Sequence, residues 1–142
     1  MTTRYHDLLA VLPQPTQADP LLERAQTLAR IYGARLHLLV VLEPVAVTGT
    51  EFSPFDIDWS IEETRFQTAE QTLHTLRERL CLPPSQASLR WGPLGLALNE
   101  HLQDHPFDLV LLPHDASGGL GNPQDRIALS LPCDCLLVRT TL

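Results

Sequence analysis

A glycine-rich segment is the part of this sequence best suited to hold a ligand. Gly118, Gly119 and Gly121 allow backbone conformations that a Cβ atom would forbid. Asn122 can cap a helix and Pro123 suits the first helical position, so the free N–H groups at that helix start face the glycines. Because such donors and the helix dipole attract anions, the segment is a candidate site for a phosphate or another anionic ligand.

His114 stands just before this segment and invites a catalytic interpretation. It lies near Asp115 and Ser117, but residues so close in sequence seldom adopt the geometry of a catalytic triad, and the nucleophile elbow of hydrolases is missing. The complete lack of lysine also removes Schiff-base enzymes and P-loop nucleotide hydrolases. The sequence therefore predicts no catalytic residue, and His114 is interpreted as a ligand contact or a pH-sensing contact.

Two other histidines have the spacing of a zinc site. His101 and His105 would share one face of a helix, but the segment HLQDH lacks the glutamate that serves as general base beside the first histidine of metalloproteases. We expect two partly exposed helix histidines and no metal site. His37, inside an apolar run, is expected to be a hydrogen-bonded residue of a sheet.

Composition restricts the class of protein further. The net charge is −7, and the ten arginines do not cluster along the chain, whereas a nucleic-acid surface needs a basic patch. No apolar stretch has the length of a signal peptide or a membrane span, so we expect a cytoplasmic protein that contacts neither membrane nor nucleic acid. Cys81, Cys133 and Cys135 form no even framework and are expected to be reduced structural thiols.

The elements that position these residues alternate between apolar runs and amphipathic segments. Helical spacing of apolar residues precedes Gly33, and a second long helix is expected to begin with a capping box formed by Ser60 and Glu63. The apolar stripe of that second helix comprises Phe66, Ala69, Leu73, Leu76 and Leu80. The expected strands are 7–12, 34–42, 87–91, 108–112 and 135–138, with Pro113 ending the fourth.

This order of elements defines the fold class. Strands alternate with helices along the chain, as in repeated βαβ units with right-handed crossovers. The sequence predicts an α/β, doubly wound (Rossmann-like) parallel sheet of five strands with four helices, in a single domain spanning residues 1–142. The long connection 45–59 receives no function.

Three short motifs agree with one known family in type, order and spacing. The turn at 91–93 (WGP) is similar to a glycine-x-proline entry into the third helix, and 108–112 (DLVLL) is similar to a fourth strand. The segment 132–139 (PCDCLLVR) resembles a closing Pro-Cys-Pro-Val-Leu-Val-Val-Arg. On these motifs, and on length, the chain resembles the single-domain universal stress proteins over almost all of its sequence.

Some members of the family that the chain resembles bind ATP and others do not. This chain departs from the ATP-binding members at two positions. Those members carry an aspartate after the first strand, a position that Pro13 holds here. After the fourth strand they carry a glycine, two residues, a glycine, nine residues, then Gly-Ser or Gly-Thr. If Gly121-Asn122 is that last pair, the loop 113–121 is about half a dozen residues too short. If 118–121 supplies the first glycines instead, the last pair falls on Leu131-Pro132, which cannot play its part.

Either alignment leaves an incomplete cradle for a triphosphate, which needs several convergent N–H donors or cations. Besides the glycines and the helix start at Asn122, only Arg126 is near enough in sequence to help. We therefore prefer a tight strand-to-helix turn without a cofactor to conventional ATP binding. Weak binding of AMP, phosphate or another small anion stays open, and Val41 would lie near the base by the resemblance alone.

The resemblance implies a non-enzymatic stress-response protein that acts as a homodimer and through an unidentified protein partner. The last strand, residues 135–139 with Cys135 and Arg139 at its ends, would lie at a sheet edge, and an exposed apolar edge favours pairing with a second copy. The alternative is a stress switch that binds ATP or AMP, and hydrolyses it slowly if at all.

Overall fold

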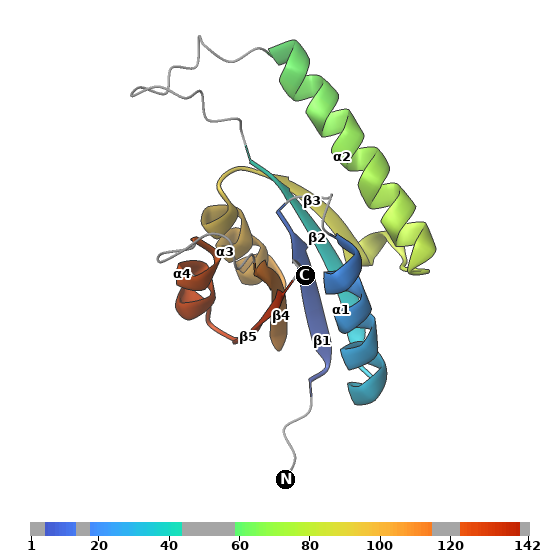
Figure 1. Cartoon of the computed structure of the whole chain (residues 1–142), viewed down its shortest axis with the longest axis vertical. Helices are drawn as coiled ribbons and strands as arrows, with labels where there is room; N and C mark the ends of the chain where they lie inside the picture. Colours follow the sequence, from blue (N-terminus) through green and yellow to red (C-terminus); the bar gives the residue numbers. More distant parts are fainter. Residues whose placement is uncertain (1–4, 14–17, 44–58, 115–122, 140–142) are drawn as a thin grey trace.

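Five parallel strands and four α-helices follow one another along the chain (Figure 1). The computed structural model describes residues 5–13, 18–43, 59–114 and 123–139. The strands are β1 (Asp7–Leu12), β2 (Arg35–Leu42), β3 (Ala87–Trp91), β4 (Leu109–His114) and β5 (Asp134–Arg139). The helices are α1 (Ala18–Tyr32), α2 (Trp59–Arg79), α3 (Leu94–Asp104) and α4 (Pro123–Ser130), with a 3-10 turn η3 (Pro84–Gln86) before β3. The predicted five-stranded, four-helix α/β architecture is confirmed.

The strand order β3-β2-β1-β4-β5 places β1 at the centre of the sheet. The chain proceeds outward from β1 to β3 on one side and then returns to build β4 and β5 on the other. The direction of winding therefore reverses between β1 and β4. In open parallel sheets, ligands bind outside the carboxyl ends of the strands at this point of reversal.

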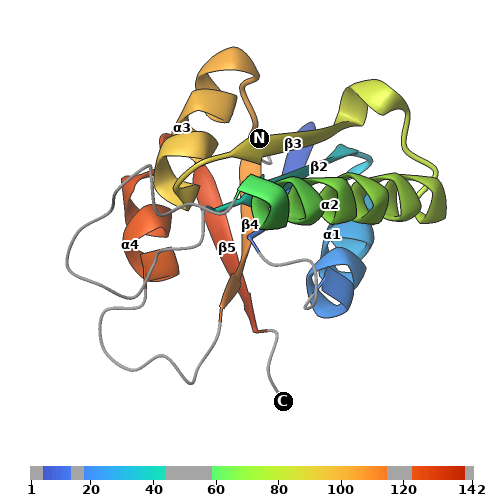
Figure 2. The same cartoon turned by 90° about the horizontal axis from the view of Figure 1, so that it is seen from above.

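Strict alternation along the strands sorts the helices onto two faces. Leu8, Ala10 and Leu12 point into the core beneath α1 and α2, whereas Leu9 and Val11 point into the core beneath α3 and α4. Figure 2 shows the same separation, with α1 and α2 on one side of the sheet and α3 and α4 on the other. A side-chain period of two on a strand buried on both faces produces such a pair of cores.

A carboxylate ties the starts of β1 and β4 together. Asp108 Oδ2 accepts hydrogen bonds from the backbone N–H groups of His6 (2.8 Å) and Asp7 (2.9 Å). Its own N–H donates to the Asp7 carbonyl (3.0 Å). These backbone donors, Asp7 before His6, lower the pKa of Asp108. The same edge holds His37, which contacts Asp7 Oδ1 through Nε2 (3.2 Å), as expected of a hydrogen-bonded sheet residue.

The fourth strand runs two residues further than the sequence predicted. Pro113 does not end β4: it pairs in register with Val138, and His114 pairs with Arg139. The register with β1 stops at Ala10↔Leu111, so Pro113 lies beyond the end of its pairing with the central strand. β1 does not pair with β4 at this position, so no hydrogen bond to β1 requires the N–H group that proline lacks. Pro113 is therefore tolerated in the strand.

The start of α2 also differs from the prediction. The helix begins at Trp59, so Ser60 lies inside it and the expected capping box is wrong. The Ser60 carbonyl instead accepts a hydrogen bond from the Thr64 hydroxyl (3.0 Å). Ala69 and Leu76 are buried as predicted, but Phe66 is 37% exposed.

His101 is buried, not partly exposed as predicted. Only 4% of it is accessible, and its ring stacks on Phe107 with a centroid separation of 5.7 Å. Arg90 of β3 donates through Nε to His101 Nδ1 (2.9 Å) and through Nη2 to Asp104 (2.8 Å). Burial and then Arg90 lower the pKa of His101 to about 4; His105 and His37 act in the same direction, and Asp104 opposes them. The histidine therefore joins β3 to α3 in its neutral form.

We expect Gly92→Ala to destabilise the fold by about 1–3 kcal/mol, because Gly92 has a φ of +134° in a region that residues with a Cβ rarely enter. The added Cβ would meet no atom within 4 Å, so the effect isolates backbone strain from crowding. Gly95→Ala is the matched control. Its Cβ would make ordinary contact with Ile127 Cγ1 (3.5 Å), and stability should change by less than about 1 kcal/mol. Urea denaturation measures both, and equal losses would contradict the assignment.

His101 should make the fold sensitive to mild acid. An unfolded histidine takes up a proton near pH 6.5, whereas folded His101 does so near 4, so the unfolded state gains protons first as the pH falls. The free energy of unfolding therefore falls as the pH drops from about 6.5 to about 4, by about 2–3 kcal/mol. We expect the free energies of unfolding of wild type and His101→Gln to converge by about this amount between pH 7 and 4.5.

His74→Gln is the control for this series, since His74 is exposed on α2 and pairs with Glu78. The difference in free energy of unfolding between His74→Gln and wild type should change little between pH 7 and 4.5. A constant difference between wild type and His101→Gln would show that His101 does not carry the acid sensitivity.

Candidate functional site

The carboxyl ends of β1 and β4 bring two predicted site residues to one edge of the sheet. Pro13 follows β1 directly, and His114 ends β4; both are partly buried. Continuing the register Ala10↔Leu111 by three residues places Pro13 level with His114. At the point where the strand order reverses, this edge of the sheet therefore presents the Pro13 ring, which has neither charge nor hydrogen-bond donor, level with His114.

The rest of the predicted anion loop lies outside the described residues. This applies to Gly118, Gly119, Gly121 and Asn122. The helix that was expected to follow them is present, and it begins at Pro123 as the position of the proline predicted. The long connection 45–59 lies almost wholly outside the described residues as well, up to Trp59 at the start of α2.

Val41 lies at the carboxyl end of β2 and is only 1% exposed. It belongs to the core beneath α3 and α4, where it packs with Leu39 and Leu98. Its side chain thus contributes to packing, and it presents almost no surface to a molecule at the sheet edge.

Glu43, which the sequence analysis did not single out, occupies the same edge. Its carboxylate Oε1 accepts a hydrogen bond from the backbone N–H of Leu94 (3.0 Å), the first residue of α3. Pro93 at the N-cap provides no side-chain hydrogen bond, so Glu43 serves as a cap from a distant part of the chain. A carboxylate here compensates the positive end of the α3 dipole, as a bound anion would.

Arg65 fixes the position of Glu43. Its Nη2 donates to the Glu43 carbonyl (2.8 Å), and its Nη1 donates to both carboxylate oxygens of Glu62 (2.9 and 2.8 Å). Glu62 is only 6% exposed. The signal for this arrangement was a glutamate directly after a strand together with a helix start that lacks a capping residue, but only the fold shows that the two meet.

The cysteines are free, and two of them, Cys133 and Cys135, are partly buried against the core beneath α3 and α4. Burial raises the pKa of Cys135 to about 11 and also raises the pKa of Cys133, where Asp134 adds to the effect. Both thiols are therefore protonated at neutral pH, which makes them poor nucleophiles.

The described part of the chain contains no group of three or more histidine, cysteine, aspartate or glutamate residues placed to hold a metal ion. Within the same residues, no helix has both the length and the apolar character needed to cross a membrane. The rings of His101 and His105 lie 5.4 Å apart between centroids, but Nδ1 of His101 already accepts a hydrogen bond from Arg90.

Comparison with known proteins places this geometry in a family. The model of the universal stress protein family matches residues 4–139. The chain is 22% identical over 137 residues to universal stress protein A homolog 2 of Coxiella burnetii, covering 93% of this chain and 92% of that protein.

Solved structures agree with this result. The universal stress protein UspA from Lactobacillus plantarum superposes with a TM-score of 0.72 at 18% identity, over 97% of this chain and all of the other. A universal stress protein solved in complex with cAMP gives 0.67 at 15% identity, over 98% of this chain and all of the other. Fold, strand order and the family match over almost the full length lead to one conclusion: the chain belongs to the universal stress protein family.

Proposed function

We propose that this protein is a cytoplasmic stress-response regulator that acts as a homodimer and through contacts with another protein, without catalysing a reaction. It works without conventional ATP binding and without contact to nucleic acid or membrane. The single observation that carries the proposal is the outer edge of β5. β5 pairs with β4 alone in the described sheet, which leaves one side of its backbone ready to pair with another strand.

The side chains of this edge suit pairing with a second copy. The centre of β5 is formed by Leu136 and Leu137, which are partly buried, and the strand carries charge only at its ends, in Asp134 and Arg139. In an antiparallel pair around a twofold axis, the residue at the axis lies opposite its own copy on the same face of the sheet, so either Leu136 or Leu137 meets the same leucine there. Covering these side chains and pairing the backbone both favour the dimer.

The carboxyl edge of the sheet supports the absence of conventional ATP binding. Pro13 stands where the ATP-binding members carry an aspartate. Beside β2, the carboxylate of Glu43 already accepts the first N–H of α3 and adds negative charge. A triphosphate beside β2 would meet the Glu43 carboxylate and not the free N–H group of Leu94. Repulsion between the two negative charges would weaken its binding.

The second candidate function is that of a nucleotide-dependent switch. One specific observation favours it: a relative with the same fold was solved in complex with cAMP. A cyclic nucleotide carries a single phosphate, so it demands fewer donors than a triphosphate and suits a shortened loop at Gly118, Gly119, Gly121 and Asn122. AMP carries a single phosphate too, and His114 is the described residue positioned to contact such a ligand.

The dimer is tested by light scattering coupled to size exclusion at micromolar concentration. We expect a mass of about twice the 15.9 kDa of one chain. Leu136→Lys should shift the protein toward the monomer, because two lysines would meet near the twofold axis. Leu129→Lys is the matched control, since Leu129 is 89% exposed on α4, away from β5. Thermal melting confirms that both variants fold, and a monomeric wild type would rule out this mode of action.

Nucleotide binding is tested by isothermal titration with MgATP, AMP and cAMP. We expect no micromolar dissociation constant for MgATP, because the edge offers a carboxylate and a proline in place of phosphate ligands. Micromolar binding of MgATP would reverse the order of the two proposals. Binding of AMP or cAMP that His114→Ala weakens would support the switch in its single-phosphate form.

A further inference from the structure

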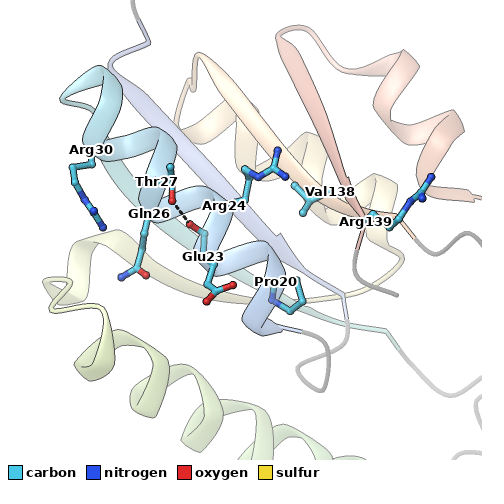
Figure 3. Close-up of a pocket in the computed structure, with 8 residues that line it drawn as sticks. All are labelled: Pro20, Glu23, Arg24, Gln26, Thr27, Arg30, Val138 and Arg139. Carbon is cyan, nitrogen blue, oxygen red and sulfur yellow. Dashed lines mark hydrogen bonds between the residues drawn. The ribbon is translucent and has the colours of Figure 1, made fainter. Parts of the chain in front are cut away.

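A groove of about 550 Å³ lies between α1 and β5, and one cation reaches across it (Figure 3). Arg24 extends from α1 toward Val138 of β5, whereas Arg30 lies on the side of α1 turned away from this strand. Arg24 is exposed and forms no ion pair with a described carboxylate. Since β5 is an edge strand, the single chain holds a positive charge beside a strand that has room for a partner.

Asp134, the first residue of β5, carries a carboxylate on the same face of the sheet. Leu136 and Val138 belong to the core beneath α1 and α2, so alternation places Asp134 on this face as well. Its Oδ2 atom accepts a hydrogen bond from the hydroxyl of Tyr5 (2.7 Å), which packs against that core. Asp134 is exposed and forms no ion pair with a described arginine. Within one chain it lies about 13 Å along β5 from Val138, away from Arg24.

Antiparallel pairing of β5 with its copy brings these two charges together in one register. When Leu136 lies at the twofold axis, Val138 of one chain lies directly opposite Asp134 of the partner subunit, because both are two residues from the axis. Directly opposed residues share a face and have Cβ atoms about 4.5–5.5 Å apart. The partner's carboxylate then lies beside Val138, toward which Arg24 reaches. Symmetry forms the same contact twice.

The other register, with Leu137 at the axis, offers no such contact. It places Leu136 opposite Val138 on the face of α1, so no carboxylate of the strand lies opposite Val138. On the other face it places Arg139 opposite Cys135, which is partly buried against the core beneath α3 and α4. Both registers cover the same two leucines, so the charges distinguish between them.

We propose that Arg24 and Asp134 form an ion pair between subunits, which fixes the register of the dimer with Leu136 at the axis. This inference rests on the homodimer proposed above and specifies its contacts. A second copy of this chain fits the edge because it supplies a carboxylate to Arg24 and a cation to Asp134 at once. A strand that lacks either charge at these positions forms at most one of the two pairs, so the contact also selects against other partners.

Mixing two charge-reversed variants tests the ion pair. Arg24→Glu brings two carboxylates together at each contact, and Asp134→Arg brings two guanidinium groups together. Each variant alone should therefore dimerise about tenfold more weakly than wild type in about 0.05 M salt. A heterodimer of the two variants joins opposite charges at both contacts. Native mass spectrometry of the mixture should show this heterodimer in excess of either homodimer.

Arg77→Glu mixed with Asp134→Arg is the matched control. It has the same net charges, but Arg77 lies on α2 beside β3, at the opposite edge of the sheet. One contact of this heterodimer still joins two guanidinium groups, so it should be weaker than the Arg77→Glu homodimer. Tyr5→Phe should leave the affinity of the dimer unchanged, which separates the lost hydrogen bond of Asp134 from the effect of its charge.

Cysteine cross-linking locates the axis without any change of charge. In a chain whose own three cysteines are replaced by alanine, Leu136→Cys should form a disulfide between subunits on mild oxidation, and Leu137→Cys should not. Absence of the cross-link at Leu136→Cys, or no preference for the heterodimer in the first mixture, would overturn the register and leave the homodimer standing. A wild type that is monomeric by light scattering would refute the homodimer, and the ion pair with it.

Discussion

The fold depends on the central strand β1, which is buried on both faces. Its five residues from Leu8 to Leu12 are between 0 and 1% exposed, and each full burial of a leucine contributes about 1.5–3 kcal/mol. Since alternate side chains enter different cores, β1 holds the pair α1 and α2 and the pair α3 and α4 in place at once. The two edges of the sheet, and any site on them, are positioned by this one strand.

Carboxylates complete the sheet at both of its ends. At the amino edge, Asp108 binds the backbone N–H groups that begin β1. At the carboxyl edge, Glu43 binds the N–H group that begins α3. Each compensates backbone donors that would otherwise lack a partner within a helix or sheet. The second also gives the carboxyl edge beside β2 the opposite charge to that of a phosphate site, so a structural role of Glu43 has a direct consequence for ligand binding.

The sequence was sufficient to predict the fold class and almost every element, because apolar periodicity reports burial directly. It failed where the outcome depends on neighbours in space. The cost of Pro113 in β4 depends on where the pairing with β1 stops, and the burial of His101 depends on Arg90 and Phe107. The capping box at Ser60 failed because the helix begins at Trp59, which places Ser60 inside its first turn. For the site, the structure brings Pro13 and His114 to one edge of the sheet, and the hydrogen bond between Glu43 and Leu94 joins residues that are far apart in the chain.

The family fold and the ligand of any one member are specified by different parts of the sequence. At 18% identity the chain still superposes on a relative with a TM-score of 0.72, because alternating apolar residues can be exchanged for one another without changing the two cores. A ligand site has less tolerance, since it needs a few polar or charged side chains at particular positions. Surface positions such as Arg24 are constrained by neither core, so they can acquire charges that differ between members.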